Sequence, residues 1–508
     1  MPEVELKLAA TTNDMLLVKQ ALLGMAGRER AARTTLTSTY YDTADGKLQR
    51  QGLTLRVRKE NRRYVQTVKT AEAAGVPFAR GEWEDVITGD RPDLRARNSG
   101  AHLPGALGDA DLHPLFTTVV RRAIVKLEPD DSTEIEGALD EGEIQAAGTG
   151  RAEPICEVEL EHKRGDPAAI YEIALRLIEV APLRIEIRSK AERGCRLLDG
   201  AVDAPQAVHP PAVQLDAGMT VEEVLQKFGR ECLEIVLRNE PGALSGVPDA
   251  LHQMRVALRR LRAALAAVKR MLPAEQYERV DQELKWLANI LGPARNWDVL
   301  SSGILAPVKS ALLSRQEFDA LLGVAEQERR LAHERAEAAI RSRRYTAALL
   351  KLSQWLAASG WRDQRVSQQS ALLMAPIGVV APTLLARRHK KVGKAIEGFA
   401  DLTLKQRHRV RIAVKKLRYS IELLESLFAR DKVAGFARRV KPLQDGLGHA
   451  NDVSVASQLL ANLPVPDKSA VVDRAAGIVL GWHDRGLVDH ERKLLKQLHR
   501  FRRARPFW

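Results

Sequence analysis

Hydrophobic and polar positions follow two different periods along this chain of 508 residues. Up to about residue 200, apolar and charged residues alternate one by one, which is typical of strands whose two faces differ. Beyond residue 215, apolar residues recur every three or four positions in long segments rich in Leu, Ala, Arg, Glu and Lys, as in amphipathic helices. The pattern predicts an α+β chain, with a strand-rich N-terminal region and an all-α C-terminal region.

The alternation in the first region predicts about eight strands that each carry charge on one face. These segments lie at residues 3–8, 54–59, 65–70, 80–86, 120–127, 134–137, 156–161 and 184–190. A single antiparallel strand commonly has one solvated face. Eight such strands in one domain favour a closed antiparallel barrel, in which the charged side chains line a hydrated tunnel and the apolar side packs under helices.

Acidic and basic residues share the predicted tunnel lining. Carboxylates on neighbouring strands suit a hard divalent ion such as Mg²⁺ or Mn²⁺, which prefers oxygen ligands. Arg and Lys side chains match phosphate oxygens. The sequence has no GxxxxGK[ST] loop, so the predicted metal and phosphate site differs from that of a P-loop protein.

Eight motifs in this region resemble those of the CYTH domain, the triphosphate tunnel metalloenzyme family. They are EVELK at 3–7, STYYDT at 38–43, LTLRVRK at 53–59, TVKT at 67–70, RGEWE at 80–84, ALDEGEI at 138–144, EVELEHKRGD at 157–166 and SKAERG at 189–194. The resemblance implies an eight-stranded antiparallel tunnel in which acidic residues hold a divalent metal and basic residues hold a triphosphate.

The resemblance also implies roles for individual residues. The implied metal ligands are Glu3, Glu5, Glu157 and Glu159. The implied phosphate-binding and catalytic residues are Lys7, Arg56, Arg58, Lys69, Arg122 and Lys190, and the further candidates are Arg80, Glu82, Asp140, Glu143 and Arg193. Arg122 is preferred to Arg121, because the alternation of Val119, Ala123 and Val125 places Arg121 on the apolar face.

A proline-rich stretch at residues 203–215 separates the two regions and also divides the charge. Residues 1–210 hold 29 basic and 34 acidic residues, which leaves 50 of the 79 basic and 31 of the 65 acidic residues beyond them. All the excess positive charge is therefore C-terminal. A region this basic attracts a polyanion, which could be a nucleic acid, an anionic membrane surface or a phosphate polymer.

The C-terminal region contains an internal repeat. HQMRVALRRLR at 252–262 aligns with HRVRIAVKKLR at 408–418 at an offset of 156, and LGPARNWDV at 291–299 is similar to LGHANDV at 447–453. Neither eleven-residue stretch contains Asp or Glu, so its basic residues, spaced along one helix face, repel one another unless an anion lies among them. We therefore expect a duplicated all-α domain that binds an anion.

The repeat resembles the CHAD domain, a helical fold built from two pseudosymmetric four-helix bundles. The resemblance implies binding of inorganic polyphosphate by the basic helices. The implied ligands are His252, Arg255, Arg259, Arg260, Arg262, His408, Arg411, Lys415, Lys416 and Arg418. The longer RNWDV sequence of the first repeat differs from the NDV of the second, so the roles of Arg295, Trp297 and Asp298 stay open.

The two resemblances together predict three segments: a CYTH tunnel domain at 1–203, a linker at 204–215 and a CHAD domain at 216–505. The expected function is hydrolysis of inorganic triphosphate to pyrophosphate and phosphate with Mg²⁺ or Mn²⁺ in the tunnel, next to a polyphosphate-binding module. The alternatives are a thiamine-triphosphatase, a nucleotide triphosphatase or an adenylate cyclase in the same tunnel, or a non-enzymatic protein of polyphosphate granules. Nucleic-acid binding is disfavoured, because only Tyr419 adjoins the second basic stretch as a base-stacking aromatic.

Location is predicted from what the sequence lacks. The first ten residues include charges where an apolar export segment would lie, and the longest apolar run, residues 371–386, is short for a bilayer span and contains two prolines. The three cysteines form no CxxC pair. These features favour a cytoplasmic protein without a membrane partner, and polyphosphate granules are a further location to consider.

Overall fold

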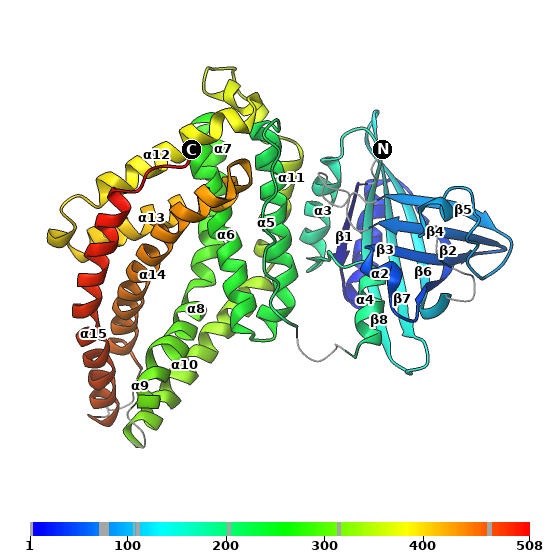
Figure 1. The fold of residues 1–508 in the computed structure, drawn as a ribbon. Coiled ribbons are helices and arrows are strands. Elements are labelled where there is room, and N and C mark those ends of the chain that lie inside the picture. The colour runs from blue at the N-terminus through cyan, green and yellow to red at the C-terminus, as the bar shows by residue number, and fades with distance from the viewer. Residues whose placement is uncertain are drawn as a thin grey trace. The chain divides into compact units, whose positions relative to one another are not determined.

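The computed structural model describes residues 4–70, 81–104, 107, 112–200, 205–311, 316–464 and 470–508, with the side chains of 316–317 and 488–489 excepted. The chain forms two compact units (Figure 1). The first unit consists of residues 1–206 and 341–360, and the second of residues 207–340 and 361–508. A strand-rich unit and a helical unit are what the two sequence periods predict.

A nine-stranded antiparallel sheet forms the centre of the first unit, in the order β5-β4-β3-β2-β6-β7-β8-β1-β9 (Figure 1). Its strands are β1 (Val4–Ala9), β2 (Ala32–Thr43), β3 (Leu53–Glu60), β4 (Arg63–Thr70), β5 (Glu82–Ile87), β6 (Leu112–Asp130), β7 (Thr133–Ala146), β8 (Ala152–Arg164) and β9 (Arg184–Ile185). Backbone hydrogen bonds therefore join the predicted strands into one continuous sheet.

Two features of the sheet differ from the prediction. The strand expected at 184–190 ends at Ile185. Lys190 instead begins helix α4 (Lys190–Leu198). The Ser189 hydroxyl caps the first turn of this helix by accepting a hydrogen bond of 3.0 Å from the backbone N–H of Glu192. Strand β2 was not among the expected strands, because its Thr, Ser and Tyr residues give little charge alternation although they favour strands.

The apolar face of the sheet is covered by helices α1 (Thr12–Met25) and α3 (Ala169–Val180), and helix α11 (Arg343–Ala357) packs against α3. Helix α11 comes from much later in the chain, yet its Leu350 is fully buried in the same core as Leu6 and Leu160. The Thr346 hydroxyl on α11 donates a hydrogen bond to the Leu183 carbonyl at 3.1 Å. The core of the first unit therefore includes a helix from residues 341–360, which lie in sequence between the two segments of the second unit.

The opposite face of the sheet carries the predicted charges at its centre and apolar residues at one end. There, Leu197 of α4 packs against Phe116 and Ile155. Gly194 permits this close approach, since a Cβ atom at that position would lie 2.3 Å from the Phe116 ring. A further short helix, α2 (Lys47–Arg50), follows β2. The packing of α4 brings its first turn to the charged part of this face.

The second unit is helical (Figure 1). Its helices are α5 (Val221–Leu244), α6 (Pro248–Val268), α7 (Ala274–Ile290), α8 (Gly292–Val299), α9 (Ala306–Ala311), α10 (Gln316–Ile340), α12 (Ile377–Ala395), α13 (Leu404–Leu424), α14 (Arg430–Ala461) and α15 (Ala470–Arg502). The two basic stretches of the repeat lie on α6 and α13, which contact each other. Helix α5 packs against α6, and α12 packs against α13. Among the described residues, no helix is both long and apolar enough to cross a membrane.

Candidate functional site

Three buried carboxylates meet on the charged face of the sheet. Asp140 of β7 lies opposite Glu157 of β8 in the strand register, and Glu159 follows on the same face two residues later. Their side chains are 0%, 2% and 11% exposed. Each contributes a carboxylate oxygen to a group whose atoms all lie within 4.8 Å of one another. We call this group the carboxylate trio.

Three cations hold the carboxylate trio together. The Lys190 Nζ lies 2.7 Å from Asp140 Oδ2, 2.5 Å from Glu157 Oε1 and 2.9 Å from Glu159 Oε1. The Arg122 guanidinium donates two hydrogen bonds of 2.7 Å to Asp140 and a third to Glu159. The Lys7 Nζ lies 3.4 Å from Glu159 and 3.1 Å from Glu5. The site is thus a compact network in which each buried charge has a partner of opposite sign.

The network shifts the proton affinities of its members. Burial alone would lower the pKa of Lys190, but Glu159, Glu157 and Asp140 outweigh burial and raise it. Burial likewise opposes the charged form of Glu159, yet Lys190 and Arg122 bring its pKa well below the usual range. The pKa values of Lys7 and Arg122 are raised for the same reason, against the effect of burial. All of these groups are therefore charged at neutral pH.

The remaining predicted cations of the sheet extend away from the trio along β3 and β4. Arg56 lies 3.3 Å from Glu82, and Lys69 lies 2.6 Å from the other oxygen of Glu82. Arg58 pairs with Glu60 at 3.2 Å. Burial, together with the neighbouring Arg56 and Arg122, lowers the pKa of Arg58. The positive charge of Arg58 is therefore less completely balanced by carboxylates than the charges of Lys7, Arg122 and Lys190. An unbalanced cation of this kind favours a bound anion.

Arg193 has a different place from the other basic residues. Its guanidinium donates to Glu153 at 2.7 Å, to Glu157 at 3.0 Å and to the Pro154 carbonyl at 2.6 Å. The side chain is 9% exposed. Three of its N–H donors are therefore engaged by the protein, and one of them holds the Glu157 carboxylate in place.

Other candidates from the sequence lie apart or outside the described residues. Glu3 and Arg80 are outside the described residues. Glu143 is exposed, near one end of β7. Arg121 is exposed, whereas Arg122 reaches the trio. The role of Asp140 was suggested only by its motif, because the short segment ALDEGEI does not show which of its three acidic residues faces inward.

The carboxylate trio fits a hard divalent cation, because it offers only oxygen donors from three ionisable side chains. Lys190 and Arg122 occupy these oxygens, so a metal ion and the two cations compete for the same negative charge. Asp140, Glu157 and Glu159 are the described residues that would hold Mg²⁺ or Mn²⁺.

A second charged site lies in the helical unit, where basic residues from α6, α8 and α13 gather. We call it the helical cation cluster; it consists of His252, Arg255, Arg259, Arg295, Arg411 and Lys415. Asp452 lies 3.9 Å from Arg411, and Asp249 interacts electrostatically with His252. Arg255 spends one donor on the Ala288 carbonyl at 2.7 Å, while its Nε is buried without a partner.

The helical cation cluster depresses the pKa of its own members. Burial and the neighbouring Arg411 and Arg259 lower the pKa of Lys415 to about 7. Burial, Arg259 and Arg295 lower that of Arg255 to about 10. His252 is shifted to a pKa of about 4, again first by burial and then by arginines. The cluster is therefore a half-buried positive site that lacks enough negative charge to balance it.

The other residues predicted to bind polyphosphate lie around this cluster or away from it. Arg262 pairs with Asp281 at 2.9 Å and Arg418 with Glu422 at 2.6 Å. The His408 ring contacts the Asn451 side chain at 3.0 Å. The structure places the remaining two, Arg260 and Lys416, on other sides of their helices, next to α5 and α12 respectively.

Two family models match the chain. Residues 1–195 match the model of the CYTH domain, and residues 228–461 match that of the CHAD domain. The chain carries a CYTH domain followed by a CHAD domain. The carboxylate trio lies in the CYTH domain and the helical cation cluster in the CHAD domain. The CYTH family is a metal-dependent tunnel family, and the trio is the acidic cluster that could serve it.

Two relatives illustrate the match. Over 195 residues the CYTH domain is 29% identical to a curated inorganic triphosphatase from Haemophilus influenzae, which covers 38% of this chain and 54% of the relative. This chain therefore spans about half the length of that relative. The CHAD domain from the plant Ricinus communis aligns with 58% of this chain and 96% of its own length, at 27% identity and a TM-score of 0.51.

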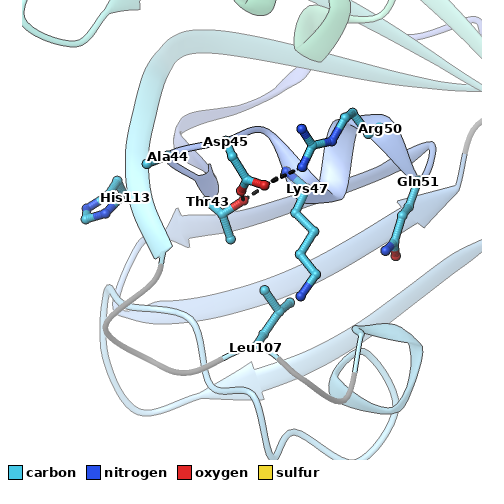
Figure 2. Close-up of a pocket in the computed structure, with 8 residues that line it drawn as sticks. All are labelled: Thr43, Ala44, Asp45, Lys47, Arg50, Gln51, Leu107 and His113. Carbon is cyan, nitrogen blue, oxygen red and sulfur yellow. Dashed lines mark hydrogen bonds and ion pairs between the residues drawn. The ribbon is translucent and has the colours of Figure 1, made fainter.

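An open pocket of about 590 Å³ lies beside α2 in the CYTH domain (Figure 2). Figure 2 shows Asp45 between Thr43 and Arg50, hydrogen bonded to the Thr43 hydroxyl at 2.6 Å and paired with Arg50. None of the carboxylate trio or its three cations lines this pocket. The pocket is therefore separate from the charged network.

Proposed function

We propose that the CYTH domain hydrolyses inorganic triphosphate to pyrophosphate and phosphate with a bound divalent metal, and that the CHAD domain binds inorganic polyphosphate. The observation that carries the first part is the carboxylate trio, surrounded by Lys7, Arg122 and Lys190 on one sheet face. The name of the Haemophilus relative and the CYTH match support triphosphate hydrolysis.

Each part of the site has a task in this reaction. A bound Mg²⁺ or Mn²⁺ would supply positive charge to the phosphate oxygens. The Lys190 and Arg122 side chains, which lie beside the carboxylate trio, carry N–H donors that match the oxygens of a phosphate chain. Arg56 and Arg58, further along β3, are spaced to bind the rest of a linear triphosphate and to stabilise charge on the transferred group. The work of the protein is positioning and electrostatics.

The experiment measures phosphate release from inorganic triphosphate, thiamine triphosphate and ATP with Mg²⁺ and with Mn²⁺. We expect the full chain to prefer inorganic triphosphate and to lose all activity with EDTA. Glu159→Gln should reduce turnover about a thousandfold, because it removes a charge from the trio. Glu128→Gln, an exposed carboxylate on β6, is the control for charge loss.

Preference for thiamine triphosphate or ATP would assign the tunnel to one of the alternative reactions. Formation of cyclic AMP from ATP would assign it to cyclisation. Absence of release from all three substrates would contradict the hydrolase and favour a protein that only binds polyphosphate.

The second part of the proposal is supported by the helical cation cluster, because half-buried cations that the nearby carboxylates do not balance are stabilised by a polyanion. The test measures affinity for long-chain polyphosphate in EDTA. Lys415→Met should weaken binding about tenfold or more, whereas Lys405→Met, an exposed lysine on the same helix, should not. Equal binding by both variants would contradict polyphosphate binding at this cluster.

A further inference from the structure

Arg193 of α4 contacts Glu157 through a guanidinium that is anchored at three points of β8. Nε donates to Glu153 at 2.7 Å, Nη1 to Glu157 at 3.0 Å and Nη2 to the Pro154 carbonyl at 2.6 Å. The Arg193 side chain is 9% exposed. Two of the three acceptors lie outside the carboxylate trio, so they fix the plane of the guanidinium independently of Glu157. The guanidinium in turn fixes the Glu157 carboxylate.

Helix α4 holds Arg193 in a defined place. The backbone N–H of Arg193 donates to the Ser189 carbonyl at 3.0 Å in the first turn, and the Ser189 hydroxyl caps that turn. Gly194 lies directly against the Phe116 ring. Lys190 and Arg193 are three residues apart and therefore share one face of α4. The helix thus presents both cations to β8.

The two cations of α4 meet different oxygens of Glu157, a residue that is only 1% exposed. Arg193 Nη1 donates to Oε2, and Lys190 Nζ lies 2.5 Å from Oε1. The approach of Lys190 lacks hydrogen-bond geometry, so Oε1 is a buried oxygen that accepts no hydrogen bond from any described residue. Glu157 therefore has one oxygen committed to Arg193 and one oxygen with unused capacity.

The other two members of the trio lack this asymmetry. Both Asp140 oxygens accept a hydrogen bond of 2.7 Å from Arg122. Glu159 accepts from Lys190 through Oε1 at 2.9 Å and from Arg122 through Oε2. A buried carboxylate oxygen without a hydrogen bond is costly and calls for a ligand. Oε1 of Glu157 is thus the oxygen of the trio that is left for a divalent cation.

We infer that Arg193 is a positioning residue that makes Glu157 a one-oxygen metal ligand and thereby favours Mg²⁺ over Ca²⁺ at the trio. Ca²⁺ takes more oxygen ligands in a flexible geometry and accepts both oxygens of one carboxylate, whereas Mg²⁺ demands near-octahedral ligands. With Oε2 held by Arg193, Glu157 offers one oxygen. The inference rests on the metal-dependent function proposed above, and it adds which ion the trio selects and which residue makes the selection.

The test measures binding of Mg²⁺ alone and of Ca²⁺ alone to the full chain by calorimetry, after divalent ions have been removed with EDTA and dialysis. The sites that Glu157→Gln loses are those of the trio. Arg193→Lys keeps the charge but cannot hold three acceptors in one plane, so Mg²⁺ affinity at these sites should fall about tenfold and Ca²⁺ affinity less than about twofold. The ratio of the two affinities is the decisive readout, because a change of charge acts equally on two divalent ions.

Arg188→Lys is the matched control. The Arg188 guanidinium pairs with Glu186 at 2.6 Å, outside the trio, and its side chain is 29% exposed. The same substitution at this position should leave both affinities unchanged. Glu153→Gln is a second test variant, because it loosens Arg193 through an acceptor whose side chain is 34% exposed. It should shift the ratio in the same direction by about threefold.

Thermal unfolding verifies that each variant is folded, and if Arg193→Lys is not, Glu153→Gln decides by the same ratio. An unchanged ratio, including an equal fall in both affinities, would overturn the positioning role of Arg193. Absence of any Glu157-dependent binding of either ion to the wild type would overturn the proposed metal site itself, and this inference with it. The two failures are therefore distinguishable.

Discussion

The two domains both gather cations, but they balance them in opposite ways. In the CYTH domain, Lys190 and Lys7 lie against carboxylates, and these carboxylates raise the pKa of both lysines although burial lowers it. In the CHAD domain, Lys415 lies among arginines, and burial with those like charges lowers its pKa to about 7. The same residue type therefore stabilises one site and strains the other.

This difference indicates how each site uses an anion. The CYTH network is nearly neutral, because its carboxylates and cations pair with one another. The CHAD cluster has unbalanced charge that an anion alone relieves. The two sites therefore differ in their internal charge balance.

The largest expected effect comes from Lys190→Met, which removes the cation shared by all three members of the carboxylate trio. Breaking a buried ion network in this way should lower the free energy of unfolding of the CYTH domain by about 3–5 kcal/mol. Triphosphate hydrolysis should be lost. Urea unfolding checks the stability, with Lys126→Met, a half-exposed lysine on β6, as the control. Unchanged stability would show that the trio does not depend on this cation.

Lys415→Met should have the opposite sign. It removes a cation that burial and two arginines disfavour, so the free energy of unfolding should rise by about 1 kcal/mol at pH 6. The native pKa of about 7 lies below the ordinary 10.5, so the unfolded chain binds more protons between these values. The free energy of unfolding of the wild type therefore increases through Lys415 as pH rises from about 7 to 10.5. The higher stability of Lys415→Met should disappear over that range. A pH series of urea titrations measures it.

Proton uptake on binding is the next effect in size. At pH 8, Lys415 is mostly neutral, and a polyphosphate chain beside it favours the ammonium form, so binding should take up about one proton. Calorimetry in two buffers of different ionisation enthalpy measures this uptake. Lys415→Met should remove it, whereas Lys405→Met should retain it. A binding enthalpy that is the same in both buffers for the wild type would contradict the coupling.

The sequence predicted the charged face of the sheet well, because strand alternation depends on local pattern. Glu157 and Glu159 alternate with buried Val158 and Leu160, and the structure keeps that separation. It did not predict that Lys190 reaches the trio from a helix, because the segment before it alternates like a strand until Ser189 caps α4. Nor does any local signal show that α11 completes the core of the CYTH domain, since that contact depends on tertiary packing alone.

The helical region shows the same limit. The repeat predicted basic stretches on two helices, and the structure places them on α6 and α13. A helical period shows which residues share a face, but it does not show which neighbouring helix that face meets. Arg260 and Lys416 align in sequence, yet one meets an aromatic ring and the other meets two cations of α12. The packing of neighbouring helices therefore decides which groups each basic side chain meets.

The smallest expected effect concerns Arg418, which shares a helix face with Lys415 in sequence spacing but has a partner of its own. Arg418 Nε lies 2.6 Å from Glu422 one turn later, and both side chains are about one-third exposed, at 36% and 29%. Such a pair contributes about 0.3–0.5 kcal/mol to stability. Arg418→Gln should therefore change unfolding by about that amount and weaken polyphosphate binding only about twofold, since Glu422 already balances the charge that is removed. Parallel titrations of Arg418→Gln and Lys415→Met with polyphosphate measure the difference. An equal loss in both would show that a cation's place along the helix matters more than its local charge balance.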